Sequence, residues 1–202
     1  MSFRRTTSRV VLVTFEPVLR AAGWALVIEE PISPADIIVI ATSTFGAGAL
    51  QAADLVHSGG VATRVAVFTD PPSGEDLEFI RRGLPYEDEA ANQIRQLRWL
   101  GVTDIQQIPR TEAGTNDEVL ALATWCDQHK FRSVVFVVAN HHSRRTRRVV
   151  NRLMKGHLTK ITVQPESYSN FEPDRWWKTR RGIEMGISEL QKLVLDFILH
   201  PI

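Results

Sequence analysis

Short runs of β-branched and other apolar residues alternate along this chain with longer segments of helical periodicity. Three of the runs are almost wholly apolar, as expected when helices cover both faces of a parallel sheet. The predicted strands are residues 36–41, 64–69, 104–108, 133–139 and 160–163. We therefore predict an α/β fold, Rossmann-like and doubly wound, with a mainly parallel sheet of about five strands and helices on both faces.

The segments between these runs have the periodicity of amphipathic helices. Val119, Leu122 and Cys126 fall on one face of the helix that follows the third run. A last helix is predicted from about Arg175, and it is expected to bury five apolar side chains: Ile183, Ile187, Leu190, Val194 and Ile198. We predict a single domain over residues 1–202, with an amino-terminal helical extension at 1–30 and a carboxyl-terminal helix at 175–200.

The composition is that of an ordinary globular protein, with 44% hydrophobic and 23% charged residues. The only cysteine, Cys126, lies in an apolar-periodic segment, and no disulfide can form within the chain. We interpret it as a core thiol and not as a nucleophile, because no basic neighbour is evident to lower its pKa. The apolar stretch after Arg9 is interrupted by Glu16, which argues against a membrane span and against a signal peptide. We expect a cytoplasmic protein, with peripheral contact to a membrane left open.

One long stretch between predicted elements has the composition of a loop. Residues 70–85 contain Pro71, Pro72, Gly74, Gly83 and Pro85. Because this stretch follows a predicted strand, it is a candidate lid over a ligand site.

In an open parallel sheet, ligands bind outside the carboxyl ends of the strands. This rule selects polar residues that directly follow the predicted strands: Thr42, Ser43, Thr44, Asp70, Thr115 and Asn140. The first three precede Gly46 and Gly48 at a helix start, an arrangement that can hold a phosphate or carboxylate. The alternative is an ordinary helix cap by Ser43 or Thr44.

The segment Thr115-Asn-Asp-Glu118 has the pattern of a capping box. In that motif the Thr115 hydroxyl and the Glu118 carboxylate satisfy backbone donors of the same helix. A ligand-binding role for Thr115 therefore depends on its place beside the strand ends.

The densest group of functional side chains runs from Asn140 to Arg145 and includes two histidines. His142 and Arg145 are three residues apart and share a helix face, so the imidazole can move a proton while the guanidinium binds an anionic group. A metal site is disfavoured, because adjacent histidines diverge in direction and cysteine partners are absent.

The same predicted helix carries a row of basic residues: Arg144, Arg145, Arg147, Arg148, Arg152 and Lys155. Nucleic acid or anionic lipid could bind such a row, but a solvated helix face is the more common structure. No nucleic-acid-binding module is recognisable, and we expect no nucleic-acid partner. Trp176 and Trp177 are interpreted as packing residues.

Four segments in order resemble the YdcF-like family, which includes the SanA and ElyC envelope proteins. They are residues 24–36 before the first strand, Glu89-Ala90 at a helix start, Thr115-Asn116-Asp117, and residues 139–146 in place of a Ser-x-x-His-x-x-Arg-Ala signature. The resemblance extends over nearly the whole chain from about residue 23.

The resemblance implies a Rossmann-like fold and a polar site at Glu89, Thr115, His142 and Arg145. Members have been connected with envelope or peptidoglycan metabolism, and one branch with S-adenosylmethionine. This sequence departs from the family pattern at four places, which are Ala41-Thr42 for a glycine pair, Thr69-Asp70 for Ser-Gly, Glu118 for asparagine and Ala139 for serine. Side chains that stand in place of the family's glycines, where the backbone would approach a ligand, are expected to narrow or reshape the pocket.

Two classes of function are consistent with this sequence. In an enzyme, Arg145 and the loop after the first strand hold a phosphorylated or nucleotide-like substrate, and His142 and Glu89 exchange protons with it. In a non-catalytic module, or a divergent inactive homologue, the same pocket binds a nucleotide or S-adenosylmethionine without turnover. The expected partner in both cases is a small anionic ligand, and no metal cofactor is expected.

Overall fold

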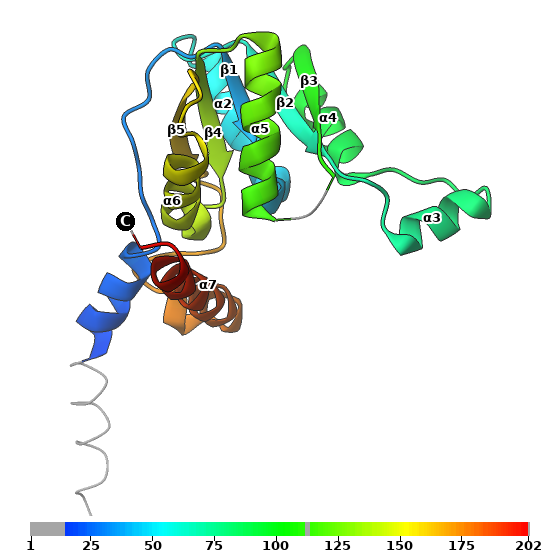
Figure 1. The fold of residues 1–202 in the computed structure, drawn as a ribbon. Coiled ribbons are helices and arrows are strands. Elements are labelled where there is room, and N and C mark those ends of the chain that lie inside the picture. Colours follow the sequence, from blue (N-terminus) through cyan, green and yellow to red (C-terminus); the bar gives the residue numbers. More distant parts are fainter. Residues whose placement is uncertain (1–14, 112–113, 202) are drawn as a thin grey trace, which may run out of the picture.

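The computed structural model describes residues 15–111 and 114–201, and a five-stranded sheet lies at its centre (Figure 1). The strands are β1 (Ile37–Ile40), β2 (Arg64–Thr69), β3 (Asp104–Pro109), β4 (Ser133–Val138) and β5 (Lys160–Pro165). All neighbouring strands are parallel, in the order β3-β2-β1-β4-β5. The predicted Rossmann-like, doubly wound α/β fold is confirmed.

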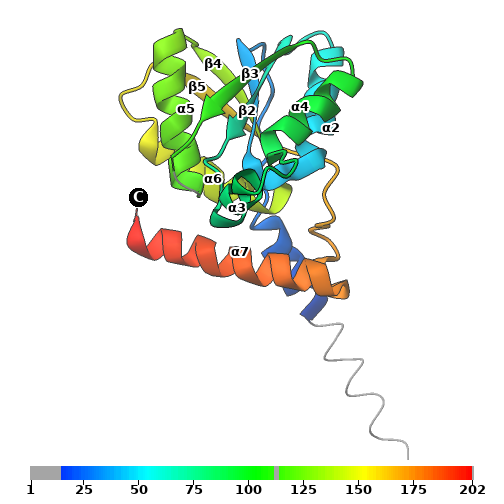
Figure 2. The ribbon, with the colours of Figure 1, turned by 90° about the vertical axis from the view of Figure 1, so that its right-hand side faces the viewer.

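Helices cover both faces of this sheet (Figure 2). α2 (Phe45–His57) and α4 (Glu89–Trp99) pack on one face, and α5 (Thr115–His129) and α6 (Ser143–Leu153) pack on the other. All four residues of β1 are buried, as expected for a central parallel strand. Cys126 lies in the core on the buried face of α5, where burial raises the pKa of its thiol to about 12. The interpretation as a core thiol is confirmed.

The strand order creates a switch point between β1 and β4. After β1 the chain forms β2 and β3 toward one edge of the sheet, and it then returns to the other side of β1 to form β4 and β5. The connections that leave β1 and β4 therefore diverge, which opens a crevice at the carboxyl ends of these two strands. Residues 41–44 and 139–142 border that crevice.

A third, smaller core joins the two ends of the described chain. Residues 15–24 are helical and lie beside the short 3-10 helix η3 (Trp176–Lys178) and α7 (Arg180–Leu199), as Figure 1 shows. Trp176 is buried here, and its indole Nε1 donates to the carbonyl of Leu19 at 2.7 Å. The predicted packing role of Trp176 is confirmed. Gly186 permits this packing, because a Cβ there would lie 2.4 Å from Trp176 Cε3.

The prediction of which face of α7 is buried is wrong. Ile183, Ile187, Val194 and Ile198 are exposed, and only Leu190 of the predicted set packs partly against the third core. The buried positions of α7 are Gly182, Gly186, Glu189, Leu193 and Asp196. The close contact with Trp176 and the ion pairs to α6 therefore determine which face of α7 is turned inward. The helix also begins at Arg180, five residues after the predicted start.

The arginines of α6 do not form the solvated face that the sequence predicts. Arg148 donates from Nε to Oδ2 of Asp196 at 2.6 Å, and Arg152 donates from Nη1 to Oδ1 of the same carboxylate at 3.1 Å. Arg147 pairs with Glu30 and donates to the carbonyl of Ile161. These side chains therefore attach α7 and the segment before β1 to α6.

Residues 70–85 contain a helix that the sequence analysis did not predict. α3 (Gly74–Arg81) begins with a capping box in which the Ser73 hydroxyl accepts from the Asp76 N–H at 3.2 Å and Asp76 accepts from the Ser73 N–H at 2.8 Å. No residue of α3 is buried. Figure 1 shows α3 at the end of an arm that extends away from the sheet, so it does not cover the switch point.

Among the described residues, no helix is both long enough and apolar enough to cross a membrane. The first part of the predicted 1–30 extension, including Arg9, lies outside the described residues. Residues 15–24 of that extension are helical, and residues 25–35 are largely without regular structure.

Candidate functional site

His142 stands at the switch point, at the end of the 3-10 helix η2 (Asn140–His142) that follows β4. Its Nδ1 lies 2.7 Å from Oε2 of Glu189 on α7. Arg145 pairs with the same carboxylate and donates from Nη1 to the hydroxyl of Thr115 at 3.2 Å. The structure therefore brings together His142, Arg145 and Thr115, as predicted, around an acid that the sequence analysis did not single out.

Glu189 has no exposed surface. Burial alone would raise the pKa of its carboxyl, but the hydrogen bond and charge of His142, followed by those of Arg145, hold the pKa below its ordinary value. Glu189 is thus an ionised partner for both side chains. One consequence is that the charge of Arg145 is already balanced within the protein.

A cavity of about 540 Å³, here named the His142 cavity, opens at the switch point. Its walls come from the first turn of α2, from the residues that follow β4 and β5, and from the start of α7. Polar and charged residues of the lining include Ser43, Thr44, His141, His142, Glu166 and Arg181. Backbone N–H groups at the amino terminus of α2 face this region and favour negative charge.

Two buried titratable groups border the His142 cavity. Burial, and then the positive charge of His142, lower the pKa of His141 to about 3, so His141 is a neutral imidazole at neutral pH. Burial raises the pKa of Glu166, against backbone hydrogen bonds from Asn140 and Tyr168 that lower it. Arg181 is therefore the one permanent positive charge among the described residues that line this cavity.

A larger cavity of about 710 Å³, here named the Arg110 cavity, lies between the carboxyl ends of β1 and β2, the start of α4 and the base of the α3 arm. Arg110 follows β3 and donates from Nε and Nη2 to the two carboxylate oxygens of Asp70, at 2.6 and 2.7 Å. The acidic residues of the lining are Asp70, Asp76, Asp88 and Glu89. The Arg110 cavity is therefore rich in carboxylates, and the His142 cavity is not.

The hydroxyl of Thr42 is engaged within the protein. Thr42 donates from both its backbone N and its Oγ1 to Oε1 of Glu118, at 2.7 and 2.6 Å. The predicted capping box at Thr115 is therefore wrong, because Glu118 points to the loop after β1 and Thr115 accepts from Arg145. Gly114 is the N-cap residue of α5 and forms no side-chain cap. The directions of the Thr115 and Glu118 side chains are therefore set by contacts with α6 and with the loop after β1, and not by a capping box within α5.

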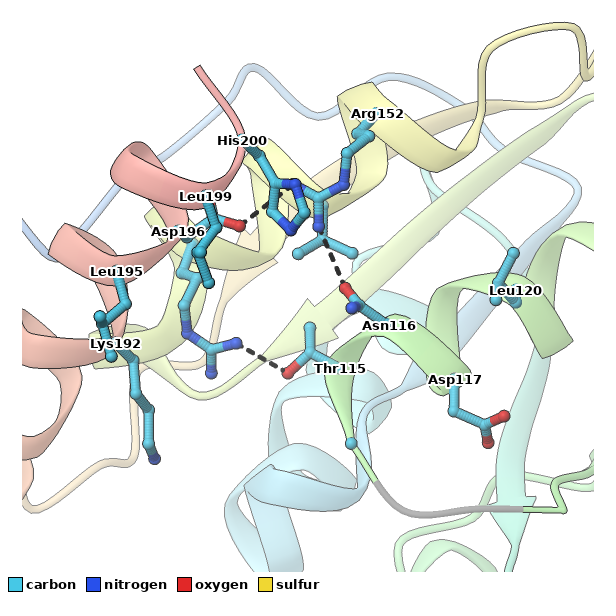
Figure 3. A pocket seen from close by; sticks show the side chains of 13 residues that line it. Thr115, Asn116, Asp117, Leu120, Arg152, Lys192, Leu195, Asp196, Leu199 and His200 are labelled. Atoms are coloured by element: carbon cyan, nitrogen blue, oxygen red, sulfur yellow. Dashed lines mark hydrogen bonds and ion pairs between the residues drawn. The ribbon is translucent and has the colours of Figure 1, made fainter. Parts of the chain in front are cut away.

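A third cavity, of about 530 Å³, lies where α5, α6 and α7 meet (Figure 3). It is here named the α7 cavity. Figure 3 shows Thr115 at its edge, with Asn116 accepting from Arg152 at 3.1 Å. Because Arg145 and Arg152 are paired with Glu189 and Asp196, the basic groups of this cavity are mostly neutralised by acids of α7.

The predicted site residues lie at the predicted edge of the sheet but are divided among these cavities. Thr42, Ser43, Asp70 and Glu89 line the Arg110 cavity; Ser43, Thr44 and His142 line the His142 cavity; Thr115 and Arg145 line the α7 cavity. The Thr44 hydroxyl donates to the carbonyl of Ala41 at 2.7 Å. Asn140 lines none of them and donates from Nδ2 to the carbonyl of Phe171 at 2.9 Å.

Glu189, Arg110 and Arg181 are site residues that the sequence analysis missed. Arg110 directly follows β3, so the same rule that selected Asp70 could have selected it. The sequence contains only a weak indication for Glu189, because it is one acid among the apolar residues of the last helix. The sequence analysis assigns the buried face of that helix to other residues.

Among residues 15–111 and 114–201, no group of three or more histidine, cysteine, aspartate and glutamate side chains is placed to hold a metal ion. The pair His141 and His142 has ring centroids 4.1 Å apart, and the Nδ1 of His142 already faces Glu189.

Universal stress proteins are among the solved structures that are similar to this chain. No protein-family model matches the chain, and no curated protein matches it. A universal stress protein solved in complex with cAMP is 16% identical, covers 67% of this chain over 100% of its own and has a TM-score of 0.40. A universal stress protein from Archaeoglobus fulgidus, solved in complex with dAMP, is 14% identical, covers 64% of this chain over 96% of its own and has a TM-score of 0.38. No site residue is transferred from either structure.

Proposed function

We propose that this protein binds a small phosphorylated or nucleotide-like molecule at the carboxyl ends of β1 and β4, with the anionic group of that molecule in the His142 cavity. The observation that carries the proposal is the position of this cavity at the switch point, where Ser43 at the amino terminus of α2 and the oriented His142 border the same space. Ligands of open α/β sheets bind at such points, and helix amino termini favour their negative charge.

Electrostatics supports this orientation of the ligand. The His142 cavity is lined by Arg181, by two histidines and by one acid, Glu166, whose pKa is raised by burial. The Arg110 cavity is lined by Asp70, Asp76, Asp88 and Glu89 against the single Arg110. An anionic group is therefore repelled from the Arg110 cavity and accommodated in the His142 cavity.

In the enzymatic form of the proposal, His142 exchanges a proton with the ligand. The contact with Glu189 fixes the Nδ1 side of the ring, so the opposite ring nitrogen is the one available for transfer. A second candidate function, binding without turnover, is favoured by one observation. Glu89, the predicted second proton-transfer group, lines the other cavity, so no second predicted acid or base accompanies His142.

The test is isothermal titration calorimetry of the full chain with ribose 5-phosphate and adenosine 5′-monophosphate. Arg181→Ala should weaken binding about tenfold or more, because a charged hydrogen bond to phosphate is lost. Arg180→Ala is the matched control, since Arg180 is 93% exposed and pairs with Glu184 outside the cavity. Absence of binding, or equal effects of the two substitutions, would contradict the proposal. Mass spectrometry of the mixtures separates turnover from binding, and His142→Gln should abolish any turnover.

We also propose that the chain is a divergent YdcF-like protein, which would connect its ligand with cell-envelope metabolism. The order of the sequence motifs supports this relationship, and so does the contact of Arg145 with both His142 and Thr115. S-adenosylmethionine is the other candidate ligand class. Binding of S-adenosylmethionine in a titration would relate the chain to the branch of the family that is connected with this ligand.

A further inference from the structure

Two buried N–H donors at the wall of the Arg110 cavity have no hydrogen-bond partner among the described residues. They are Nη1 of Arg110 and Nε2 of Gln93. The two residues are 7% and 2% exposed, and both line the cavity. Buried polar groups are nearly always hydrogen-bonded, and an unpaired one costs about 1–3 kcal/mol. The Arg110 cavity is therefore lined by two residues whose buried donors lack a partner.

The Arg110 donor is held in place. Its Nε and Nη2 are bound to Asp70, and its backbone N donates to the carbonyl of Thr69 at 2.9 Å. The nearest acid to Nη1 is Glu118, whose Oε1 lies 3.8 Å away and already accepts two hydrogen bonds from Thr42. The hydrogen bonds to Asp70 thus fix the orientation of the planar guanidinium group, and the N–H donors of Nη1 remain without an acceptor.

The charge around these donors selects the kind of acceptor they bind. Asp76, Asp88 and Glu89 also line the cavity, and Asp70 already balances the charge of Arg110. A carboxylate or phosphate placed here would face several negative charges. The acceptor that fits is a neutral one, such as a ring carbonyl or a ring nitrogen. N–H groups on the same ring can donate hydrogen bonds to the carboxylates.

A flat ring also meets aromatic surface in this cavity. Phe45 and Tyr86 line it together with Phe68. Aromatic side chains stack on nucleobases of any sequence, because every base has a π-face. Ser43 and Phe45 line both this cavity and the His142 cavity, so one ligand can extend from one into the other across the first turn of α2.

We infer that the Arg110 cavity binds the base of a nucleotide, with Arg110 Nη1 and Gln93 Nε2 donating to acceptors on the ring and Glu89 accepting from its N–H groups. The inference depends on the proposed function, because it assigns the phosphate of the same ligand to the His142 cavity. It narrows the ligand class from phosphorylated molecules in general to nucleotides.

The experiment compares ribose 5-phosphate with the four common ribonucleoside 5′-monophosphates by calorimetry on the full chain. At least one nucleotide should bind about tenfold or more tightly than ribose 5-phosphate, because stacking and base hydrogen bonds are added. Gln93→Leu and Arg110→Lys should each weaken the binding of that nucleotide about threefold to tenfold. Arg110→Lys keeps the charge beside Asp70 and loses Nη1. Binding of ribose 5-phosphate should be unchanged in both variants.

Gln164→Leu is the matched control, because Gln164 is a buried glutamine in β5 at the edge of the sheet far from β3. Equal affinity for ribose 5-phosphate and all four nucleotides would overturn the nucleobase inference while leaving the phosphate site in place. A nucleotide preference that survives both substitutions would overturn it too. If neither ligand class binds, the inference and the proposed function are both wrong.

Discussion

The imidazole of His142 on η2 contacts the carboxylate of Glu189 on α7, with 2.7 Å between Nδ1 and Oε2. This contact connects the carboxyl-terminal helix directly to the switch point of the sheet. Glu189 also pairs with Arg145, so one buried acid orients both functional side chains that the sequence places on one helical face. The position of α7 and the geometry of the candidate site therefore depend on each other.

Glu189→Gln should destabilise the protein strongly. The substitution leaves the charge of Arg145 without its buried partner, and removing one member of a buried ion pair costs about 3 kcal/mol or more. Urea unfolding followed by circular dichroism measures the change. Glu184→Gln on the same helix is the control, because Glu184 and Arg180 are 61% and 93% exposed and such pairs contribute less than about 1 kcal/mol. Similar losses for both variants would contradict a special role for Glu189.

His141→Phe should reduce the loss of stability in weak acid. The pKa of His141 is lowered to about 3 in the folded protein, below its ordinary value of 6.5, so the unfolded chain takes up the proton first. The stability that depends on neutral His141 is complete above pH 6.5 and is lost as the pH falls toward 3. Between pH 7 and pH 5 the wild type should lose about 2 kcal/mol more than the variant. Urea unfolding at both pH values tests this, and parallel curves would contradict it.

Cys126 should react with thiol reagents only when the protein unfolds. Burial raises the pKa of its thiol to about 12, so the thiolate fraction at pH 8 is about one in ten thousand. Because Cys126 is the only cysteine, a chromogenic disulfide reagent reports on this position alone. We expect complete reaction in urea and a rate in buffer that follows global stability across variants. Fast labelling of the native protein would contradict the buried position.

Periodicity predicted the strands and the sheet class well, because burial on both faces leaves a strong apolar pattern in β1, β2 and β4. Side-chain direction at the site was harder to predict. On α7 the sequence has apolar residues on a face that the structure exposes, whereas Glu189 and Asp196 are turned inward by the arginines of α6. Such long-range charge pairing leaves no periodic signal in either segment.

Two departures from the YdcF-like pattern contact each other. Thr42 stands where that pattern has a glycine, and Glu118 stands where it has an asparagine. In the structure the backbone N and hydroxyl of Thr42 both donate to Glu118. The loop after β1 and the start of α5 are distant in the sequence, so the contact between these two departures could not be predicted from either segment.

The α3 arm should be the least protected helix of the described chain. Leu77, Phe79 and Ile80 are exposed, and no residue of α3 is buried, so the helix is held by the Ser73 capping box, by local ion pairs and by the hydrogen bond of Tyr86 to Asp76. Ser73→Ala should therefore cost the local helix about 1 kcal/mol and leave the unfolding midpoint of the domain nearly unchanged. Hydrogen exchange with mass spectrometry should show faster exchange in peptides covering 74–81 in the variant, with α2 and α5 unaffected. A lower global midpoint would instead mean that α3 packs on the domain.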